Sequence, residues 1–254
     1  MSDNLFSLTS RVALVTGASS GIGRHVAGVL AQHGASTVVT ARRGDALDAV
    51  VAEIKDAGGR ATALVADLGA PEDAGELARR AAEPFGAPDI LINTAGMNPR
   101  KHADHVTPEV WQQTLDLNLA VPFFLAQALV PGMREKGQGN IINVASLQSY
   151  RAFANGLPYG ASKGGIVQLT RAMAEAWSAD GITVNAIAPG FFPTELTGPV
   201  FDDDATAAHH ASMTAIGRNG RMEDLDGVTV FLASRASAYI TGQVIAVDGG
   251  YTAK

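Results

Sequence analysis

The sequence predicts an α/β fold: one doubly wound parallel sheet of about seven strands, with helices on both faces. Short β-branched runs alternate along the chain with longer segments of helical period. The short runs are apolar on both faces, as strands of a covered parallel sheet are, and right-handed crossovers place helices on both sides. No linker-like stretch and no repeat interrupts the 254 residues, so a single domain over residues 1–254 is expected.

The elements are expected in a regular order. Buried strands are predicted at residues 12–16, 37–40, 63–66, 90–93, 140–144, 182–187 and 244–247. Helices are predicted at about residues 21–33, 43–57, 71–85, 108–136, 158–179 and 224–233. Apolar residues at helical spacing support the second helix: Leu47, Val50, Val51 and Ile54. Pro71 suits the first turn of the third helix. This order is Rossmann-like, and residues 189–204 are expected to be irregular, within a substrate loop of about residues 189–215.

Composition excludes several classes of function. Nineteen basic residues against 25 acidic ones give a net charge of −6, which argues against nucleic-acid binding through clustered cations. There are no cysteines, so disulfides, thiolate metal sites and cysteine nucleophiles are excluded, and no metal site is predicted. The first residues lack a secretory pattern, and the longest apolar runs are far short of a membrane span. A cytoplasmic protein without a membrane partner is expected.

A glycine-rich segment follows the first strand and opens the first helix. Gly17 permits a sharp turn, Gly21 lets the backbone approach a pyrophosphate, and Gly23 allows close packing of helix on strand. Free amides at the start of the helix then face the anion. A purely structural turn is the alternative, but the strand–loop–helix context favours dinucleotide binding.

The end of the second strand bears on the choice of cofactor. An acidic residue there would accept hydrogen bonds from the ribose 2′-hydroxyl of NAD, whereas the 2′-phosphate of NADP requires cations. The chain has Arg42 and Arg43 and no acid before Asp45, and arginine binds phosphate through a planar fork. We therefore expect NADP(H) to be preferred and NAD(H) to be possible. Arg43 fits a solvated first-turn helix residue better than Arg42, so Arg42 is the favoured phosphate ligand.

Two further strand ends carry candidate cofactor contacts. Asp67 follows the third strand, where it either accepts from the adenine amino group or caps a turn. Small residues at 93–96 follow the fourth strand, where the backbone would pass close to a ribose.

Tyr159 and Lys163 are candidates for the chemical step. They are four residues apart on one predicted helix, so their side chains share a face. The reference pKa of tyrosine is about 10, which makes it a weak base at neutral pH. A neighbouring ammonium favours the phenolate and is expected to lower this pKa toward useful acid–base behaviour. The pair alone is a weak motif.

Several motifs in one order make a stronger signal than any one of them. The chain contains Thr16-Gly-x-x-x-Gly-Ile-Gly23, Asn93-x-Ala-Gly96, Asn118, Ser146, Tyr159-x-x-x-Lys163, Asn185 and Pro189-Gly190. Together they resemble the classical short-chain dehydrogenase/reductase family over essentially the whole chain. Taken singly, each residue has a structural alternative: Ser146 as a turn cap, Asn118 as a satisfied polar helix residue, and Lys163 as part of a solvated face.

The resemblance implies roles for the matching residues. Tyr159 is the general acid/base, Lys163 binds the nicotinamide ribose and stabilises the phenolate, and Ser146 hydrogen-bonds the substrate oxygen. Asn118 positions a water that links Lys163 to bulk solvent. Cofactor contacts are expected from Gly17, Ser19, Ser20, Gly21, Ile22, Gly23, Arg42, Arg43, Asp67, Leu68, Asn93, Ala95, Gly96, Tyr159, Lys163, Pro189, Gly190, Phe192 and Thr194. The family commonly has a second Asn where this chain has Thr94, which leaves open whether a side chain braces the sheet there.

The substrate is expected to be hydroxylated and anionic, because polar and cationic residues lie where it would pass. These residues, with one aromatic neighbour, are Arg100, Gln148, Arg151, Asn155 and Phe191. Residues 190–199 and 216–221 also resemble the gluconate 5-dehydrogenase branch of the family, which implies NADP-dependent oxidoreduction of a sugar acid or polyol.

The sequence leaves two alternative functions open and implies an oligomeric assembly. A 3-oxoacyl-carrier-protein reductase would need a basic docking patch, for which Arg100, Lys101, Arg134 and Lys136 are the candidates. A non-catalytic dinucleotide-binding sensor is the alternative of another class. The resemblance also implies a homotetramer built on the helices near 108–136 and 158–179 and on the C-terminal region.

Overall fold

The computed structural model describes residues 4–254, whose seven strands form one parallel sheet. The strands are β1 (Val12–Thr16), β2 (Ser36–Ala41), β3 (Arg60–Val65), β4 (Ile90–Asn93), β5 (Gly139–Val144), β6 (Ile182–Pro189) and β7 (Val244–Val247). Their order is β3-β2-β1-β4-β5-β6-β7. The order reverses between β1 and β4, and doubly wound sheets bind ligands in the crevice at such a point. The predicted fold class is confirmed.

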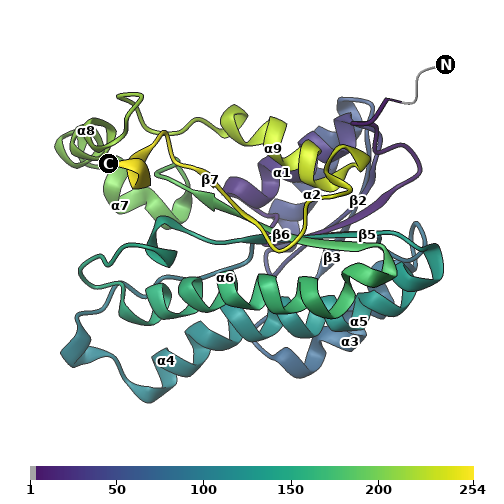
Figure 1. Ribbon diagram of the computed structural model, residues 1–254, viewed down its shortest axis with the longest axis horizontal. Helices are drawn as coiled ribbons and strands as arrows, with labels where there is room; N and C mark the ends of the chain where they lie inside the picture. Colours follow the sequence, from purple (N-terminus) through teal and green to yellow (C-terminus); the bar gives the residue numbers. More distant parts are fainter. Residues whose placement is uncertain (1–3) are drawn as a thin grey trace.

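Helices cover both faces of the sheet (Figure 1). Three lie above it in this view: α1 (Gly21–Gln32), α2 (Gly44–Asp56) and α9 (Asp226–Ala233). Four lie below it: α3 (Ala74–Ala82), α4 (Pro108–Leu115), α5 (Val121–Lys136) and α6 (Leu157–Trp177). Two short helices lie together at one end, near the C-terminus: α7 (Gly198–Phe201) and α8 (Asp204–Met213).

An apolar core fills the space on each side of the sheet. Leu30, Leu47 and Leu232 are fully buried on the side of α1, α2 and α9. Leu125 and Met133 are fully buried on the side of α3, α5 and α6. Burying one such side chain stabilises the fold by about 1.5–3 kcal/mol. The two apolar cores hold the helices on the sheet. The loops described below begin at the carboxyl ends of these strands.

Short 3₁₀ helices connect the main elements. They are Pro71–Asp73, Ala103–His105, Leu147–Ser149, Ser178–Asp180, Glu195–Thr197, Met222–Leu225, Arg235–Ser237 and Tyr251–Ala253. The third strand begins at Arg60, three residues before the predicted start, because Arg60 pairs with Ser36 in the neighbouring strand. Its polar first residues hid the strand from a search for apolar runs.

The region predicted to be irregular contains more helix than expected. Residues 189–204 include the 3₁₀ helix Glu195–Thr197 and α7, and α8 follows directly. The sequence of α8 has no buried residue and no apolar stripe, so periodicity could not reveal it. Asp203 caps it by accepting a hydrogen bond from the Thr206 amide at 3.0 Å.

The long helix predicted at 108–136 is interrupted in its middle. A π-helical segment, Asp116–Ala120, lies between α4 and α5, and such bulges are frequent at functional sites. The continuous stretch Pro108–Lys136 is long enough, and contains a window apolar enough, to span a membrane by length and composition. The expectation that no segment approaches a span is therefore wrong. Here the stretch is a core helix, because one face of α5 packs against the sheet through Leu125, Leu129 and Met133.

Candidate active site

The glycine loop between β1 and α1 has the geometry of a pyrophosphate cradle. Gly17 and Gly21 adopt left-handed backbone angles, with φ of +63° and +53°, which side chains disfavour. A Cβ at Gly17 would lie 2.8 Å from the backbone of Ala95, so the loop packs directly on the segment after β4. Ser20 begins α1 without a side-chain cap hydrogen bond, so the first amides of the helix face outward for an anion. The residues present fit a dinucleotide.

Threonines brace this loop against the neighbouring strand. The hydroxyl of Thr94 donates to the carbonyl oxygen of Thr16. In return, Thr16 Oγ1 accepts from the amides of Thr94 at 3.1 Å and Ala95 at 3.2 Å. At this departure from the family pattern, the Thr94 hydroxyl thus braces the sheet through the main-chain carbonyl of Thr16.

Arg43, rather than Arg42, faces the glycine loop. Arg43 precedes α2, and its guanidinium donates to Ser19 Oγ at 3.0 Å and Ser20 Oγ at 2.9 Å. Arg42 is exposed, and within residues 4–254 no hydrogen bond or ion pair holds its side chain. Arg43 is thus the arginine that contacts the glycine loop, while the choice of Arg42 as the phosphate ligand stays a prediction. Because Arg43 is the residue directly before α2, its side chain reaches across to Ser19 and Ser20.

Four side chains predicted for the chemical step meet at the carboxyl edge of β4 and β5. Lys163 Nζ lies 5.7 Å from the centre of the Tyr159 ring and donates to the carbonyl oxygen of Val144 at 2.6 Å. Tyr159 and Lys163 are only 8% and 4% exposed. A Cβ at Gly96 would lie 3.8 Å from Lys163 Nζ and 3.2 Å from Asn118 Oδ1, so Gly96 keeps the space beside them open. A solvated face for Lys163 is therefore wrong.

The π-helical segment places Asn118 in this group. Asn118 Nδ2 donates to the carbonyl oxygen of Met97 at 2.9 Å and to Ser162 Oγ at 3.0 Å. Its Oδ1 accepts from the Met97 amide at 2.9 Å. Asn118 thus fixes the loop after β4 to α6, the helix that carries Tyr159.

Ser146 caps the turn after β5, as one of its two predicted roles requires, and it also lies beside Tyr159. It caps the 3₁₀ helix Leu147–Ser149, accepting from the Gln148 amide at 3.1 Å. Ser149 Oγ ties the same turn to α6 by donating to the Lys163 carbonyl oxygen at 2.6 Å. The capped turn holds the Ser146 hydroxyl close to the phenol of Tyr159, whose pKa it lowers.

The electrostatics differ from the sequence-based expectation. Burial raises the pKa of Tyr159 above its ordinary value, and the neighbouring Ser146 hydroxyl and the charge of Arg100 offset only part of this rise. Burial also lowers the pKa of Lys163 to about 8. The expected lowering of the Tyr159 pKa is wrong, because desolvation outweighs the Ser146 hydrogen bond and the charge of Arg100.

Comparisons with known proteins agree with this arrangement. A family model described as enoyl-(acyl carrier protein) reductase matches residues 17–252. Gluconate 5-dehydrogenase of Gluconobacter oxydans (strain 621H) is 37% identical, over 98% of this chain and 97% of the relative. The 2-dehydro-3-deoxy-D-gluconate 5-dehydrogenase of Bacillus subtilis (strain 168) is 39% identical over the same shares. A crystal structure of a gluconate 5-dehydrogenase from Burkholderia cenocepacia J2315, in complex with NADP and tartrate, is 36% identical. It superimposes with a TM-score of 0.94 over 99% of this chain and 98% of that chain.

The chain belongs to the short-chain dehydrogenase/reductase family. The resemblance carried by the sequence motifs is thereby confirmed, and with it the class of oxidoreductases that act on CH–OH groups.

Of the substrate residues predicted for this short-chain dehydrogenase/reductase, Arg100 is the one whose charge acts on Tyr159. Its backbone has a left-handed φ of +48°. Gln148 is half-buried against Gly156, where a Cβ would collide with its amide. Asn155 is exposed on a left-handed turn, with φ of +59°.

Phe191 and Arg151 belong to an aromatic cluster that sequence reasoning did not find. The Phe191 ring stacks on His210 of α8, with centroids 3.8 Å apart, and lies 5.8 Å from the Tyr251 ring. Arg151 lies over Tyr251 at 5.6 Å and donates to the carbonyl oxygen of Lys254 at 3.1 Å. His210 and Tyr251 come from α8 and the C-terminal segment, and no local motif marks either of them.

Several residues predicted to contact the cofactor have structural contacts through their side chains. Phe192 is 2% exposed in the core and packs on Gly220, so its side chain is not free to contact a cofactor. Leu68 is likewise a core residue. Asn93 donates to Asn143 Oδ1 at 2.9 Å between β4 and β5.

Asp67 lies at an exposed turn after β3. Its Oδ1 accepts from the Gly69 amide at 3.0 Å. This supports the turn-cap alternative for Asp67. The bond uses only Oδ1, and Oδ2 does not take part in it.

The basic docking patch weighed for a carrier protein is not assembled. Lys136 donates to Asp89 Oδ2 at 3.0 Å, and Asp89 immediately precedes β4, at the amino end of the strand. Arg134 pairs with Asp180 at 2.6 Å. Both cations are thus neutralised, and Lys136 lies at the edge of the sheet opposite the catalytic residues.

Proposed function

We propose that this protein is an NADP-dependent oxidoreductase that transfers hydride between the cofactor and a secondary alcohol or ketone carbon of a sugar acid. The observation that carries the proposal is the grouping of Tyr159 with Lys163 and Ser146, with Asn118 and Gly96 beside Lys163. The full-length similarity to enzymes named for gluconate and 2-dehydro-3-deoxy-D-gluconate supports the substrate class.

NADP is the cofactor that the residues favour, with NAD as a weaker alternative. The outward-facing start of α1 suits the pyrophosphate, and Arg43 provides a cation beside Ser19 and Ser20 for the 2′-phosphate. The related structure from B. cenocepacia contains NADP, which supports the same choice here.

Each catalytic side chain has one task in this proposal. Bound NADP supplies or accepts the hydride. Tyr159 gives its phenol proton to the substrate oxygen during reduction and takes it back during oxidation. Ser146 donates a hydrogen bond to that oxygen and stabilises its developing charge. Lys163 holds the nicotinamide ribose hydroxyls and stabilises the phenolate, and Asn118 keeps the Met97 loop and α6 in register.

Arg100 is proposed to bind the carboxylate of the substrate. Its guanidinium acts on the Tyr159 phenol through charge, so a sugar acid reaching Tyr159 passes within the field of a cation. The ring of Phe191 stacks on His210 of α8 and adds an aromatic group to the lining that we propose for the substrate. Such a site selects a substrate that has a carboxylate at one end and hydroxyl groups along its carbon chain.

Turnover of NADPH over a small ketone panel tests this function. We expect absorbance loss with a keto-gluconate and much less with an acetoacetyl thioester, since the basic patch is not assembled. Tyr159→Phe should retain NADPH binding and lose turnover. Preferred use of the thioester would instead indicate the carrier-protein reductase, and NADPH binding without any turnover would indicate a sensor.

We further propose a homotetramer in the cytoplasm. Phe124 of α5 is 42% exposed, beside a Phe123 ring that stacks on Trp177 of α6 at 6.3 Å, which supports an apolar contact between subunits on these helices. Light scattering is expected to give four times the chain mass, and a monomer at micromolar concentration contradicts the assembly. Cell fractionation with a cytoplasmic marker tests the location.

A further inference from the structure

A short segment lies between the glycine loop and Arg100. We name it the cover segment, residues 194–197. Thr194 caps the 3₁₀ helix Glu195–Thr197 and lies against the glycine loop, because a Cβ at Gly21 would be 3.2 Å from its side chain. The cover segment therefore touches the loop that is proposed to hold the pyrophosphate.

Two arginines hold the cover segment by hydrogen bonds. Arg100 Nη2 donates to the carbonyl oxygen of Leu196 at 2.9 Å on the substrate side. Arg43 holds Glu195 through two parallel bonds, Nη1 to Oε1 and Nη2 to Oε2, each 2.9 Å long. This fork-to-carboxylate geometry is the one that arginine also offers to a phosphate.

We propose that Glu195 is a cofactor-selectivity residue: its carboxylate occupies the Arg43 fork that the 2′-phosphate of NADP must take, so NADP binds by displacing it. This inference rests on the proposed NADP-dependent function. Arg43 also donates to Ser19 and Ser20, which keeps its guanidinium at the loop. Because Nη1 and Nη2 bind the Glu195 carboxylate, they cannot bind the 2′-phosphate in the same way at the same time.

The competition tunes cofactor affinity without blocking it. The Arg43 and Glu195 side chains are 52% and 62% exposed, and an ion pair so exposed changes an equilibrium constant by a factor of only about 2–5. A phosphate with up to two negative charges competes successfully for the fork. NAD carries a hydroxyl at the same place and leaves the pair intact, so Glu195 narrows the preference for NADP over NAD.

The test compares dissociation constants for NADPH and NADH, measured by cofactor fluorescence at low and high salt. Glu195→Gln keeps the size of the side chain and removes the competing charge. We expect it to tighten NADPH binding about 2–5-fold while NADH binding stays within error, and the gain should shrink at high salt.

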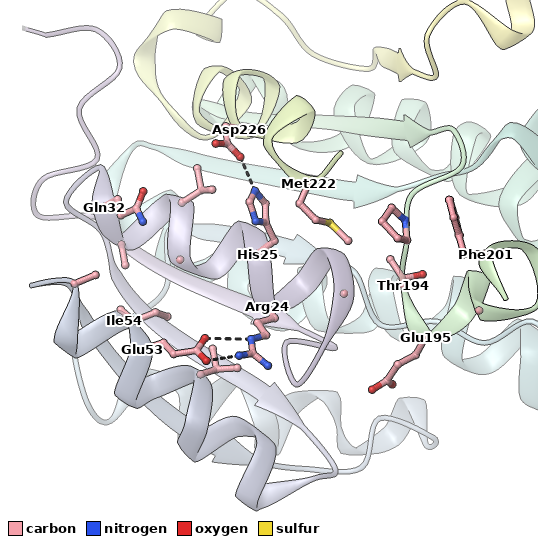
Figure 2. A pocket seen from close by; sticks show the side chains of 18 of the residues that line it. Arg24, His25, Gln32, Glu53, Ile54, Thr194, Glu195, Phe201, Met222 and Asp226 are labelled. Atoms are coloured by element: carbon pink, nitrogen blue, oxygen red, sulfur yellow. Dashed lines mark hydrogen bonds and ion pairs between the residues drawn. The ribbon is translucent and has the colours of Figure 1, made fainter. Parts of the chain in front are cut away.

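A matched control separates local competition from general charge. Glu195 and Glu53 both line a groove of about 810 Å³ beside α1. Figure 2 shows Glu53 paired with Arg24 on the wall formed by α1 and α2, apart from Glu195. Glu53→Gln removes the same charge from the groove without freeing Arg43, so NADPH affinity should not change.

The outcomes distinguish the inference from the function on which it rests. Unchanged or weaker NADPH binding by Glu195→Gln overturns the inference, as does equal tightening of NADPH and NADH or an equal effect of Glu53→Gln. If the unaltered protein binds neither dinucleotide, the proposed function fails and the inference fails with it.

Discussion

Replacing Lys163 by methionine should stabilise the folded protein near neutral pH while abolishing activity. Lys163 is buried, and burial lowers its pKa from 10.5 to about 8. A tenfold change in proton affinity corresponds to about 1.4 kcal/mol, so holding the ammonium inside the folded protein costs about 3 kcal/mol. Methionine has a similar length and carries no charge.

The sign follows from proton binding. Below pH 8 the lysine is protonated in both states, and the folded state bears the full cost. Between pH 8 and 10.5 the unfolded chain binds more protons than the folded protein, so the stability of the unaltered protein rises with pH. Above pH 10.5 the cost disappears. The stability advantage of Lys163→Met should therefore fall by roughly 2 kcal/mol between about pH 7.5 and pH 10.

Urea unfolding followed by tryptophan fluorescence measures this difference, at one protein concentration because subunit association adds to stability. The variant also loses the 2.6 Å hydrogen bond to Val144, which offsets the gain by about 1–3 kcal/mol. The pH dependence is therefore a sharper test than the absolute value. Lys55→Met changes an exposed lysine and should give a flat difference. A flat difference for Lys163→Met would refute the reasoning.

Three further outcomes are expected. Asp89→Ala removes the partner of the buried Arg11, which Asp89 contacts at 2.6 Å, and should lower the free energy of unfolding in urea by about 3–5 kcal/mol. As a control, Asp180→Ala at an exposed ion pair should lower it by less than about 1 kcal/mol. Because burial raises the pKa of Tyr159, the reduction rate should stay flat near neutral pH while the oxidation rate rises with pH; a falling oxidation rate contradicts this. Arg100→Gln should raise KM about tenfold or more for a keto sugar acid and leave KM for a neutral ketose unchanged in steady-state assays.

The sequence predicted most of the fold and the chemical residues because both leave local patterns. The strands β1, β4 and β7 begin and end where their apolar runs do. Gly17, Gly21 and Gly23 lie where a side chain would clash with a neighbouring segment or strain the backbone. The four-residue spacing of Tyr159 and Lys163 places them on one face of a helix. Such features depend on neighbours in the chain.

Other features arise from contacts between distant segments. Whether Arg42 or Arg43 meets the glycine loop depends on how α2 begins against Ser19 and Ser20. The aromatic cluster needed α8 and the C-terminal Tyr251 to reach Phe191. The burial of Phe192 against Gly220 also joins segments that are distant in the chain.

The sequence by itself determined the alternating parallel sheet through periodicity, and its motifs in order indicated the family and the candidate catalytic side chains. Only the tertiary structure decided the direction in which the Tyr159 pKa moves and the pairing of Arg43 with Glu195. Desolvation and ion pairing depend on which atoms surround a group in space. Residues 152 positions apart in the chain make that pair.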